Sequence, residues 1–265
     1  MRGLIDIGAN LVHDSFDHDR DLVIQRAYDA GVTRLIVTGS TLESSRSALA
    51  LARNAPGRLF ATVGVHPHHA VDFGPDAAEG LIALATRPEC VAIGECGLDY
   101  YRNLSPPAAQ RLAFDRQLSL AATTGKPVFL HQRDAHDDFV AMLREHRSDI
   151  VGGVAHCFTG DSKQMHDYLQ MDLYIGVTGW ICDERRGEAL REAVAQLPLD
   201  RVMLETDAPY LLPRNLPDSR RSRRNEPALL LAVLDMTAQC MGVEKHVLAE
   251  AATRNTERLF GLPAA

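Results

Sequence analysis

Short apolar runs alternate with longer amphipathic stretches along almost the whole chain. The short runs have the composition of buried strands, whereas the longer stretches repeat apolar residues at helical spacing. The short runs are residues 3–7, 33–38, 59–63, 91–94, 127–130, 153–156, 173–176 and 202–205. Strands that alternate with helices form parallel sheets, and about eight such units close a barrel. The pattern therefore predicts an α/β protein with a (β/α)8 TIM-like barrel.

Several helical stretches carry residues that typically begin or end a helix. Residues 19–30 show helical spacing and are followed by a glycine, which often ends helices. Prolines within residues 105–107 predict the start of a second helix, which should end at Gly125. Residues 225–227 predict a cap and a first turn, leading into a final helical pair that ends near Phe260.

Composition points to one globular domain. The chain has 265 residues, 46% hydrophobic and 24% charged, and a (β/α) barrel occupies about 250 residues around one core. We therefore interpret residues 1–265 as a single TIM-barrel domain. No signal region is expected, and no apolar stretch approaches the ~20 residues that a membrane helix needs. Five cysteines without a Cys-x-x-Cys pair suit a reducing compartment, so we expect a cytoplasmic protein.

The charges limit how the chain could contact nucleic acid. A formal net charge of −7 argues against a surface covered with phosphate-binding lysines, so such contact should be local. One short segment is rich in arginine, with Arg214, Arg220, Arg221, Arg223 and Arg224. Loops after the last strands of such barrels often bind phosphate, and a helix beginning near Asn225 would offer N–H groups to the same anion. The alternative is a solvated charged loop.

Titratable residues stand at or just beyond the ends of six predicted strands. They are Asp6, His66, Glu95, His131, His156 and Asp207. In a barrel, chemistry occurs at the mouth formed by these ends. Each residue alone could be a hydrogen-bonded structural side chain, but burying several together without a cation would be costly. We therefore expect Glu95, His131, His156 and Asp207 to bind one divalent metal ion.

Further roles follow from position. Asp207, beside the ion, is expected to accept the proton of metal-bound water as a general base, with Glu95 as its catalytic partner. We assign His66 to the substrate rather than to the metal, and expect His68 and His69 to be exposed loop residues. Arg133, two residues beyond His131, could clamp a phosphate, with an ion pair to a neighbouring acid as the alternative.

Five motifs in a fixed order resemble the TatD family of metal-dependent deoxyribonucleases. The motifs are residues 64–67 (GVHP), 93–99 (IGECGLD), 131–135 (HQRDA), 156–160 (HCFTG) and 205–211 (ETDAPYL). The resemblance covers essentially the whole chain, and five motifs in order are far more specific than any one alone. The resemblance implies a distorted, amidohydrolase-like barrel and a magnesium-dependent 3'-5' exonuclease acting on single-stranded DNA and RNA.

The resemblance also implies that Glu95, His131 and His156 bind metal and that Asp207 completes the site. Substrate phosphate is expected to contact His66, Arg133, Arg224 and Asn10, while Asp6 and Glu205 are expected to support the site. One departure matters. Many members open with Asp-x-His-x-His, whereas residues 6–10 read DIGAN and lack both histidines. We therefore expect one firmly bound metal ion, and a second ion only where substrate phosphate helps to hold it.

The hypothesis is a nuclease with Mg²⁺, while Mn²⁺ and Zn²⁺ fit the same mixed donors. Single-stranded DNA and RNA are its expected partners; a monomer is assumed and no membrane is expected. One alternative is an amidohydrolase or esterase acting on a small molecule or on aminoacyl-tRNA. Another is a non-catalytic, metal-bound accessory protein. The arginine-rich segment favours an enzyme that binds phosphate over turnover of uncharged esters.

Overall fold

The computed structural model describes residues 3–216 and 223–264. The chain divides into two compact units. Unit 1 contains Met1–Ile36, Cys157–Leu169 and Tyr174–Ala265, and unit 2 contains Val37–His156 and Gln170–Leu173. Strands that are consecutive in the sequence are neighbours in space. In unit 2, β3 to β6 lie side by side; in unit 1 the order is β7, β8, β1 and β2, because a bridge joins the chain beyond β8 to β1. The interpretation of residues 1–265 as one domain stays a prediction.

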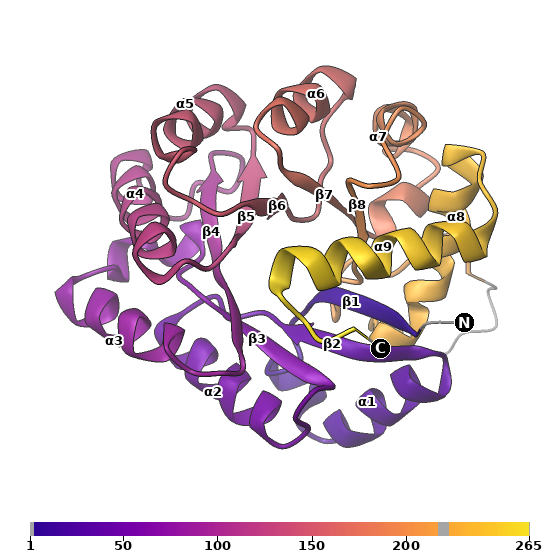
Figure 1. Cartoon of the computed structure of the whole chain (residues 1–265), viewed down its shortest axis with the longest axis horizontal. Coiled ribbons are helices and arrows are strands. Elements are labelled where there is room, and N and C mark those ends of the chain that lie inside the picture. Colours follow the sequence, from indigo (N-terminus) through magenta and orange to yellow (C-terminus); the bar gives the residue numbers. More distant parts are fainter. Residues whose placement is uncertain (1–2, 217–222, 265) are drawn as a thin grey trace. The chain divides into compact units, whose positions relative to one another are not determined.

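Unit 2 is a parallel sheet with its helices on one face (Figure 1). Its strands are β3 (Leu59–Val63), β4 (Cys90–Asp99), β5 (Val128–Arg133) and β6 (Gly153–Ala155). Its helices are α2 (Leu42–Arg53), η2 (Pro67–Asp72), α3 (Pro75–Ala85), α4 (Pro107–Thr124) and α5 (His136–His146). Every residue of β4 is buried, as expected for a strand with neighbours on both edges and cover on both faces.

A bulge in β4 brings its polar residues into position. Ile93 pairs with Val128, but the next pair joins Cys96 to Leu130, so β4 holds one extra residue there. Gly97 has φ +147°, and a Cβ atom at this position would collide with the carbonyl oxygen of His131. Only glycine allows the two backbones to approach so closely.

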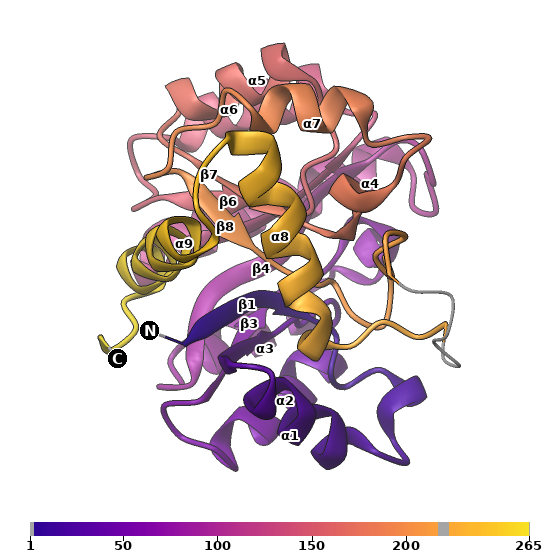
Figure 2. The same ribbon diagram turned by 90° about the vertical axis from the view of Figure 1, so that its right-hand side faces the viewer.

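Unit 1 combines the first and last strands of the chain. Its strands are β1 (Leu4–Ala9), β2 (Val32–Val37), β7 (Tyr174–Val177) and β8 (Val202–Leu204). Its helices are η1 (Asp14–Phe16), α1 (Arg20–Asp29), α6 (Ser162–Gln170), η3 (Gly179–Cys182), α7 (Glu188–Val194), η4 (Pro227–Leu229), α8 (Leu230–Met241) and α9 (Lys245–Phe260). Strands β7 and β8 pair in parallel, and a bridge joins Ala9 to Ala208. Figure 2 shows α8 crossing close to α9.

The predicted elements agree well where a strand is purely apolar and less well where it carries polar residues. The run 59–63 coincides with β3, and Gly125 caps α4 with φ +62°. The largest error is β4, predicted to end at residue 94 and observed to continue to Asp99. The apolar pattern breaks there because two glycines and Glu95 follow Ile93, at the point where the register with β5 shifts. Asp6 likewise lies inside β1, not at its end.

The predicted cap at residues 225–227 was also wrong in detail. Glu226 occupies the N-cap position of η4, without a side-chain capping bond, and the regular helix begins only at Leu230. Among the described residues, no single helix is long and apolar enough to span a membrane. Within the described part of the chain, one pair of helices, Pro227–Met241 and Lys245–Phe260, is long and apolar enough when the two are counted together, but the pair is bent by 108°.

Candidate functional site

Three imidazoles of unit 2 surround one carboxylate oxygen. The Oε1 atom of Glu95 lies 3.0 Å from His131 Nδ1, 3.2 Å from His66 Nε2 and 3.3 Å from His156 Nε2. Glu95 lies in β4 and His131 in β5, while His66 and His156 follow β3 and β6 closely. Neighbouring parallel strands end at the same edge, and this brings together residues far apart in the sequence. We call these four residues the Glu95 cluster.

A second carboxylate, that of Asp99, touches the Glu95 cluster. Its Oδ2 atom lies 2.7 Å from His68 Nε2 and 3.4 Å from His131 Nε2. Asp99 is 1% exposed at the end of β4. The sequence prediction missed it because the strand was ended at residue 94. His68, expected to be exposed, is half-buried against Asp99, whereas His69 is exposed as predicted.

Burial and charge set the protonation of the Glu95 cluster. Burial opposes ionisation of Glu95, but the neighbouring imidazoles of His66 and His156 and hydrogen bonds from the rings outweigh it and lower its pKa well below the ordinary value. Burial lowers the pKa of His66 to about 4, which leaves its ring neutral at pH 7. Burial opposes protonation of His131, yet hydrogen bonds to Asp99 and Glu95 prevail and raise its pKa.

The donor set fits a divalent cation. One ligand atom each of His66, Glu95 and His131 lies within 4.8 Å of the others, a spacing that one ion with bonds of about 2.0–2.2 Å nearly bridges. The ionised carboxylate of Glu95 and the neutral ring of His66 already have the protonation states that metal binding requires, and an ion would displace the proton that His131 favours. The described residues therefore include a group that can hold a metal ion. The structure places His66, assigned from sequence to the substrate, among the candidate ligands.

Two buried glutamines of α4 hold the backbone beside the cluster. The Gln117 amide accepts from the Val65 N–H at 2.7 Å and donates to the Val65 carbonyl at 3.0 Å. Gln110 does the same for Asp99, at 2.8 and 3.1 Å. Seven residues apart, they share one face of the helix. The sequence analysis missed both, although polar residues on an otherwise buried helix face are a signal that could have revealed them.

Asp207, the fourth predicted ligand, belongs to unit 1 and lies just beyond β8. Its N–H donates to the Gly8 carbonyl at 2.8 Å, and its Oδ1 accepts from Asn10 Nδ2 at 2.9 Å. Its φ of +54° lies in the left-handed region, which is uncommon for a residue other than glycine. The bond to Gly8 holds the backbone of Asp207 in this conformation, and the bond from Asn10 holds its side chain. Asn10, expected to contact phosphate, orients Asp207 here.

The two predicted supporting residues are fully buried in unit 1. Asp6 accepts from the Thr206 N–H at 3.0 Å, from Thr206 Oγ1 at 2.5 Å and from the Gly8 N–H at 3.2 Å. Burial nevertheless raises the pKa of Asp6 to about 7. Glu205 accepts from the Cys157 N–H at 2.5 Å. Both carboxylates are thus satisfied mainly by neutral donors.

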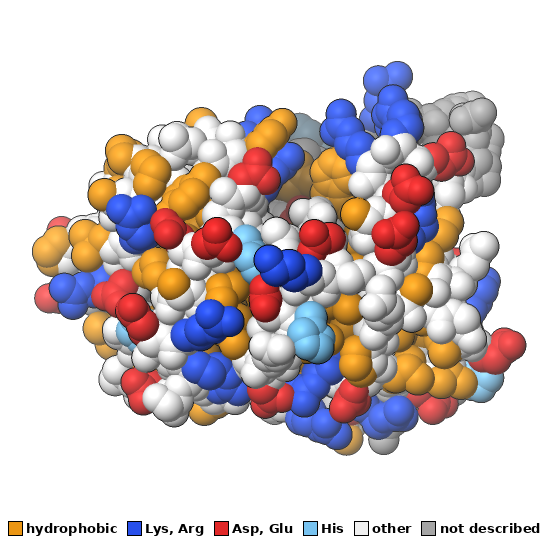
Figure 3. Space-filling model, turned by 90° about the horizontal axis from the view of Figure 1, so that it is seen from above, with side chains coloured by type: hydrophobic (Ala, Val, Ile, Leu, Met, Phe, Trp, Pro, Cys, Tyr) orange, Lys and Arg blue, Asp and Glu red, His pale blue; other side chains and the backbone are white. Residues whose placement is uncertain are grey.

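Arg224, predicted to bind phosphate, is engaged within unit 1. Its guanidinium donates to both carboxylate oxygens of Asp19, at 2.9 and 2.7 Å, and to the Ser15 carbonyl, and it lies over the Phe16 ring. Of the remaining predicted arginines, Arg214 and Arg223 are exposed, and Arg220 and Arg221 lie outside the described residues. Figure 3 shows basic and acidic side chains interspersed on the face it presents, in keeping with local rather than global phosphate contact.

Asn225, adjacent to Arg224, orders the loop beyond β8 instead of capping a helix. Its side-chain amide donates to the carbonyls of Thr206 and Tyr210, at 2.9 and 2.7 Å. In unit 2, Arg133 stacks on the ring of Tyr101, with its guanidinium carbon 3.9 Å from the ring centroid.

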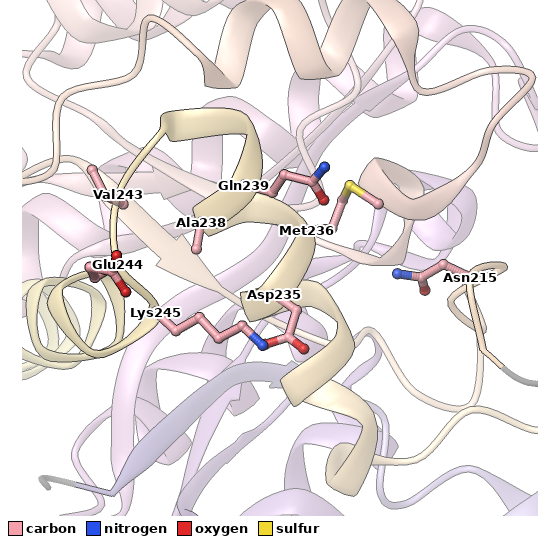
Figure 4. A pocket seen from close by; sticks show the side chains of 8 residues that line it. All are labelled: Asn215, Asp235, Met236, Ala238, Gln239, Val243, Glu244 and Lys245. Carbon is pink, nitrogen blue, oxygen red and sulfur yellow. The ribbon is translucent and has the colours of Figure 1, made fainter.

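A surface cavity in unit 1 lies where α8 meets α9, and none of the predicted site residues lines it (Figure 4). The ammonium of Lys245 and a carboxylate oxygen of Asp235 lie 2.7 Å apart there. The two side chains point toward one another in Figure 4 and neutralise each other's charge.

Strand-borne carboxylates and imidazoles on successive β/α units define a class, the (β/α)8 metal-dependent hydrolases. Residues 5–261 match the family described as TatD related DNase. The chain is 49% identical to the 3'-5' ssDNA/RNA exonuclease TatD of Erwinia billingiae, covering 98% of this chain and 100% of that one. The chain therefore belongs to the TatD family.

Other relatives agree. The 3'-5' ssDNA/RNA exonuclease TatD of Citrobacter rodentium is 49% identical, with 98% of each chain covered. A solved TatD homologue from Escherichia coli K12 is 31% identical, with a TM-score of 0.89 and 98% of each chain covered. A TatD family hydrolase from Entamoeba histolytica is 25% identical, with a TM-score of 0.90 and 99% of each chain covered. The predicted (β/α)8 barrel and the predicted nuclease class are thereby confirmed.

Proposed function

We propose that this chain is a metal-dependent 3'-5' exonuclease that hydrolyses phosphodiester bonds in single-stranded DNA and RNA. The observation that carries the proposal is the Glu95 cluster, in which an ionised, buried carboxylate is ringed by three imidazoles. Polarity and substrate are supported by the names of the relatives that are 49% identical over nearly the whole chain. We place the enzyme, as one domain, in the cytoplasm.

We assign Glu95, His131 and His156 as metal ligands, with Asp207 completing the set and His66 as a further donor. Mg²⁺ is the working ion, and Mn²⁺ and Zn²⁺ suit the same nitrogen and oxygen donors. Such an ion, when bound, polarises a phosphate oxygen and makes water more acidic. His131 lies between Glu95 and Asp99, so a proton on Nε2 that is shared with Asp99 would make Nδ1, on the Glu95 side, the nitrogen that binds the ion.

The remaining chemistry belongs to unit 1. Asp207 accepts a proton from the attacking water, because its carboxylate is held in one orientation by Asn10 and by Gly8. Asp6 and Glu205 keep the residues around β8 in place through their bonds to Thr206 and Cys157. Their role is structural support rather than contact with the reacting atoms.

The test is a time course on 3'-labelled single-stranded DNA with Mg²⁺. We expect His131→Ala and Asp207→Asn each to lower the rate roughly 10²- to 10⁴-fold, while the matched control His69→Ala, at an exposed histidine, retains it. Blunt duplex should be degraded far more slowly, because its 3' ends are paired. Full activity in both active-site variants, or equal rates on duplex and single strands, would refute the proposal.

A further inference from the structure

The connection between β4 and α4 presents an exposed aromatic ring two residues beyond Asp99. Tyr101 is 59% exposed, and tyrosine is usually at least partly buried. The Arg133 guanidinium covers one part of the ring, with its carbon 3.9 Å from the centroid. A ring that is supported by a cation and still largely open to solvent can accept a second flat partner.

The backbone around Tyr101 is held on both sides. The Tyr100 N–H donates to the Arg133 carbonyl at 2.9 Å, and the Arg102 N–H donates to Asp99 Oδ1 at 2.7 Å. The side chain of Tyr101 is therefore carried by a fixed turn. A ring that is already placed loses little conformational entropy when it binds a partner.

The stack is built on the strands that carry the Glu95 cluster. Asp99 and Arg133 are paired in register at the ends of β4 and β5, four residues beyond Glu95 and two beyond His131. Asp99 also contacts the His131 ring at 3.4 Å. Two extended residues span at most about 7 Å, so the Tyr101 backbone lies within that distance of Asp99. The ring thus lies just beyond the ends of the two strands that carry Glu95 and His131.

The surroundings suit a nucleobase and its backbone. Leu104 is 66% and Val71 60% exposed, and Ser105 ties their segments together by accepting from the Val71 N–H and donating to the His68 carbonyl. Arg102, beside Tyr101, is exposed as well. An exposed aromatic ring that is supported by a guanidinium group is what proteins use to bind unpaired bases.

We infer that Tyr101, supported by Arg133, is a base-stacking subsite that takes an unpaired nucleobase next to the scissile phosphate of single-stranded DNA or RNA. The inference rests on the proposed nuclease function, which it deepens by naming where the strand is held. A base inside a duplex has both faces covered by its neighbours, so the subsite accepts only a frayed or single strand. Stacking does not distinguish the bases strongly, which suits an enzyme that digests any sequence.

The experiment measures binding apart from turnover. Fluorescence anisotropy in EDTA follows two labelled strands, an intact deoxythymidine oligonucleotide and the same strand with abasic residues at its 3' end. We expect Tyr101→Ala to raise the Kd of the intact strand by about 5- to 150-fold, the equivalent of roughly 1–3 kcal/mol of stacking. Tyr101→Phe should bind like the unaltered protein, and all forms should bind the abasic strand equally weakly.

Val151→Ala is the matched control, since Val151 is 62% exposed and precedes β6, at the opposite end of that strand from His156. Equal binding of the intact strand by the Tyr101→Ala and unaltered proteins overturns the inference. So does a Tyr101→Ala loss of the same size on intact and abasic strands, which would indicate a general distortion. Base-dependent binding without cleavage in Mg²⁺ would leave the subsite in place and defeat the proposed nuclease function instead.

Discussion

Unit 1 and unit 2 each bury carboxylates near strand ends, but they satisfy them in opposite ways. In unit 2, Glu95 lies among three imidazoles, and its pKa is lowered. In unit 1, Asp6 accepts bonds from Thr206 and Gly8, and burial raises its pKa to about 7. A buried acid on a barrel strand is therefore not by itself a metal ligand. The groups that face it decide whether it is held charged, ready for a cation, or neutral.

Substitutions of the two carboxylates, Glu95 in unit 2 and Asp6 in unit 1, should differ most in their effect on exonuclease activity. Glu95→Gln removes the central charge of the cluster, so we expect loss of metal binding and a fall in exonuclease rate of roughly 10²- to 10⁴-fold. Asp6→Asn keeps the shape of a neutral acid. Its exonuclease rate should fall by less than about tenfold, because Asp6 is not expected to touch a reacting atom. Rates on 3'-labelled single-stranded DNA with Mg²⁺ decide this. Equal losses in both variants would show that the distinction between the two carboxylates is wrong.

The next difference is in how stability depends on pH. The pKa of Asp6 rises from 3.8 to about 7 on folding, so between these values the unfolded chain has lost a proton that the folded chain keeps. Stability should then fall as pH rises from about 4 to 7, by about 1.4 kcal/mol per unit and about 4 kcal/mol in all. Asp6→Asn should remove this slope.

The measurement is urea unfolding at several pH values with EDTA present. The quantity to compare is the difference in unfolding free energy between the unaltered protein and Asp6→Asn, because other titrating groups cancel in it. A difference that stays constant from pH 4 to pH 7 would mean that Asp6 is ionised in the folded protein. The neutral state assigned to it would then be mistaken.

Metal should stabilise the fold through the Glu95 cluster and not through Asp6. At an ion concentration 100 times its Kd, binding to the folded state adds about 2.7 kcal/mol, which thermal unfolding with Mg²⁺ or with EDTA reports as a rise in Tm. We expect the rise to vanish in Glu95→Gln and to persist in Asp6→Asn. Protection that persists in Glu95→Gln would place the ion elsewhere.

The sequence predicted the strand-end residues of unit 2 better than their partners. Glu95, His131 and His156 stand out because each interrupts or ends an apolar run, and parallel strands bring such positions to one edge. Asp99 was hidden by the glycines and the glutamate of β4, which look like the end of a strand. The register instead shifts within this stretch, and the strand continues to Asp99.

Contacts between distant segments were out of reach. The pairing of Arg224 with Asp19 joins residues 205 positions apart, and nothing in the arginine-rich segment indicates it. Asn10 and Asp207 are likewise 197 positions apart. A pattern of apolar residues predicts which face of an element is buried, whereas the choice of polar partner depends on the position of every strand between them.

The smallest of the expected effects concerns Gln117, which the apolar pattern of α4 did not reveal. Gln117→Leu leaves the N–H and carbonyl of Val65 without their partner, which should lower the free energy of unfolding by about 2 kcal/mol. Because His66 follows Val65 directly, the Glu95 cluster should loosen as well, and Mg²⁺ affinity should fall by about 10-fold. Urea unfolding and a metal titration of the same protein measure the two effects.

If Gln117 has a purely structural role, Gln117→Leu should lower the free energy of unfolding and leave the Mg²⁺ affinity unchanged. The matched control is Gln25→Leu, at an exposed position of α1 in unit 1, which should change neither. A Gln117→Leu protein that is destabilised but binds Mg²⁺ normally would mean that His66 keeps its place without help from α4. Equal Mg²⁺ affinity in Gln117→Leu and His66→Ala would instead mean that the helix acts on the ion through His66, since the glutamine itself touches only backbone.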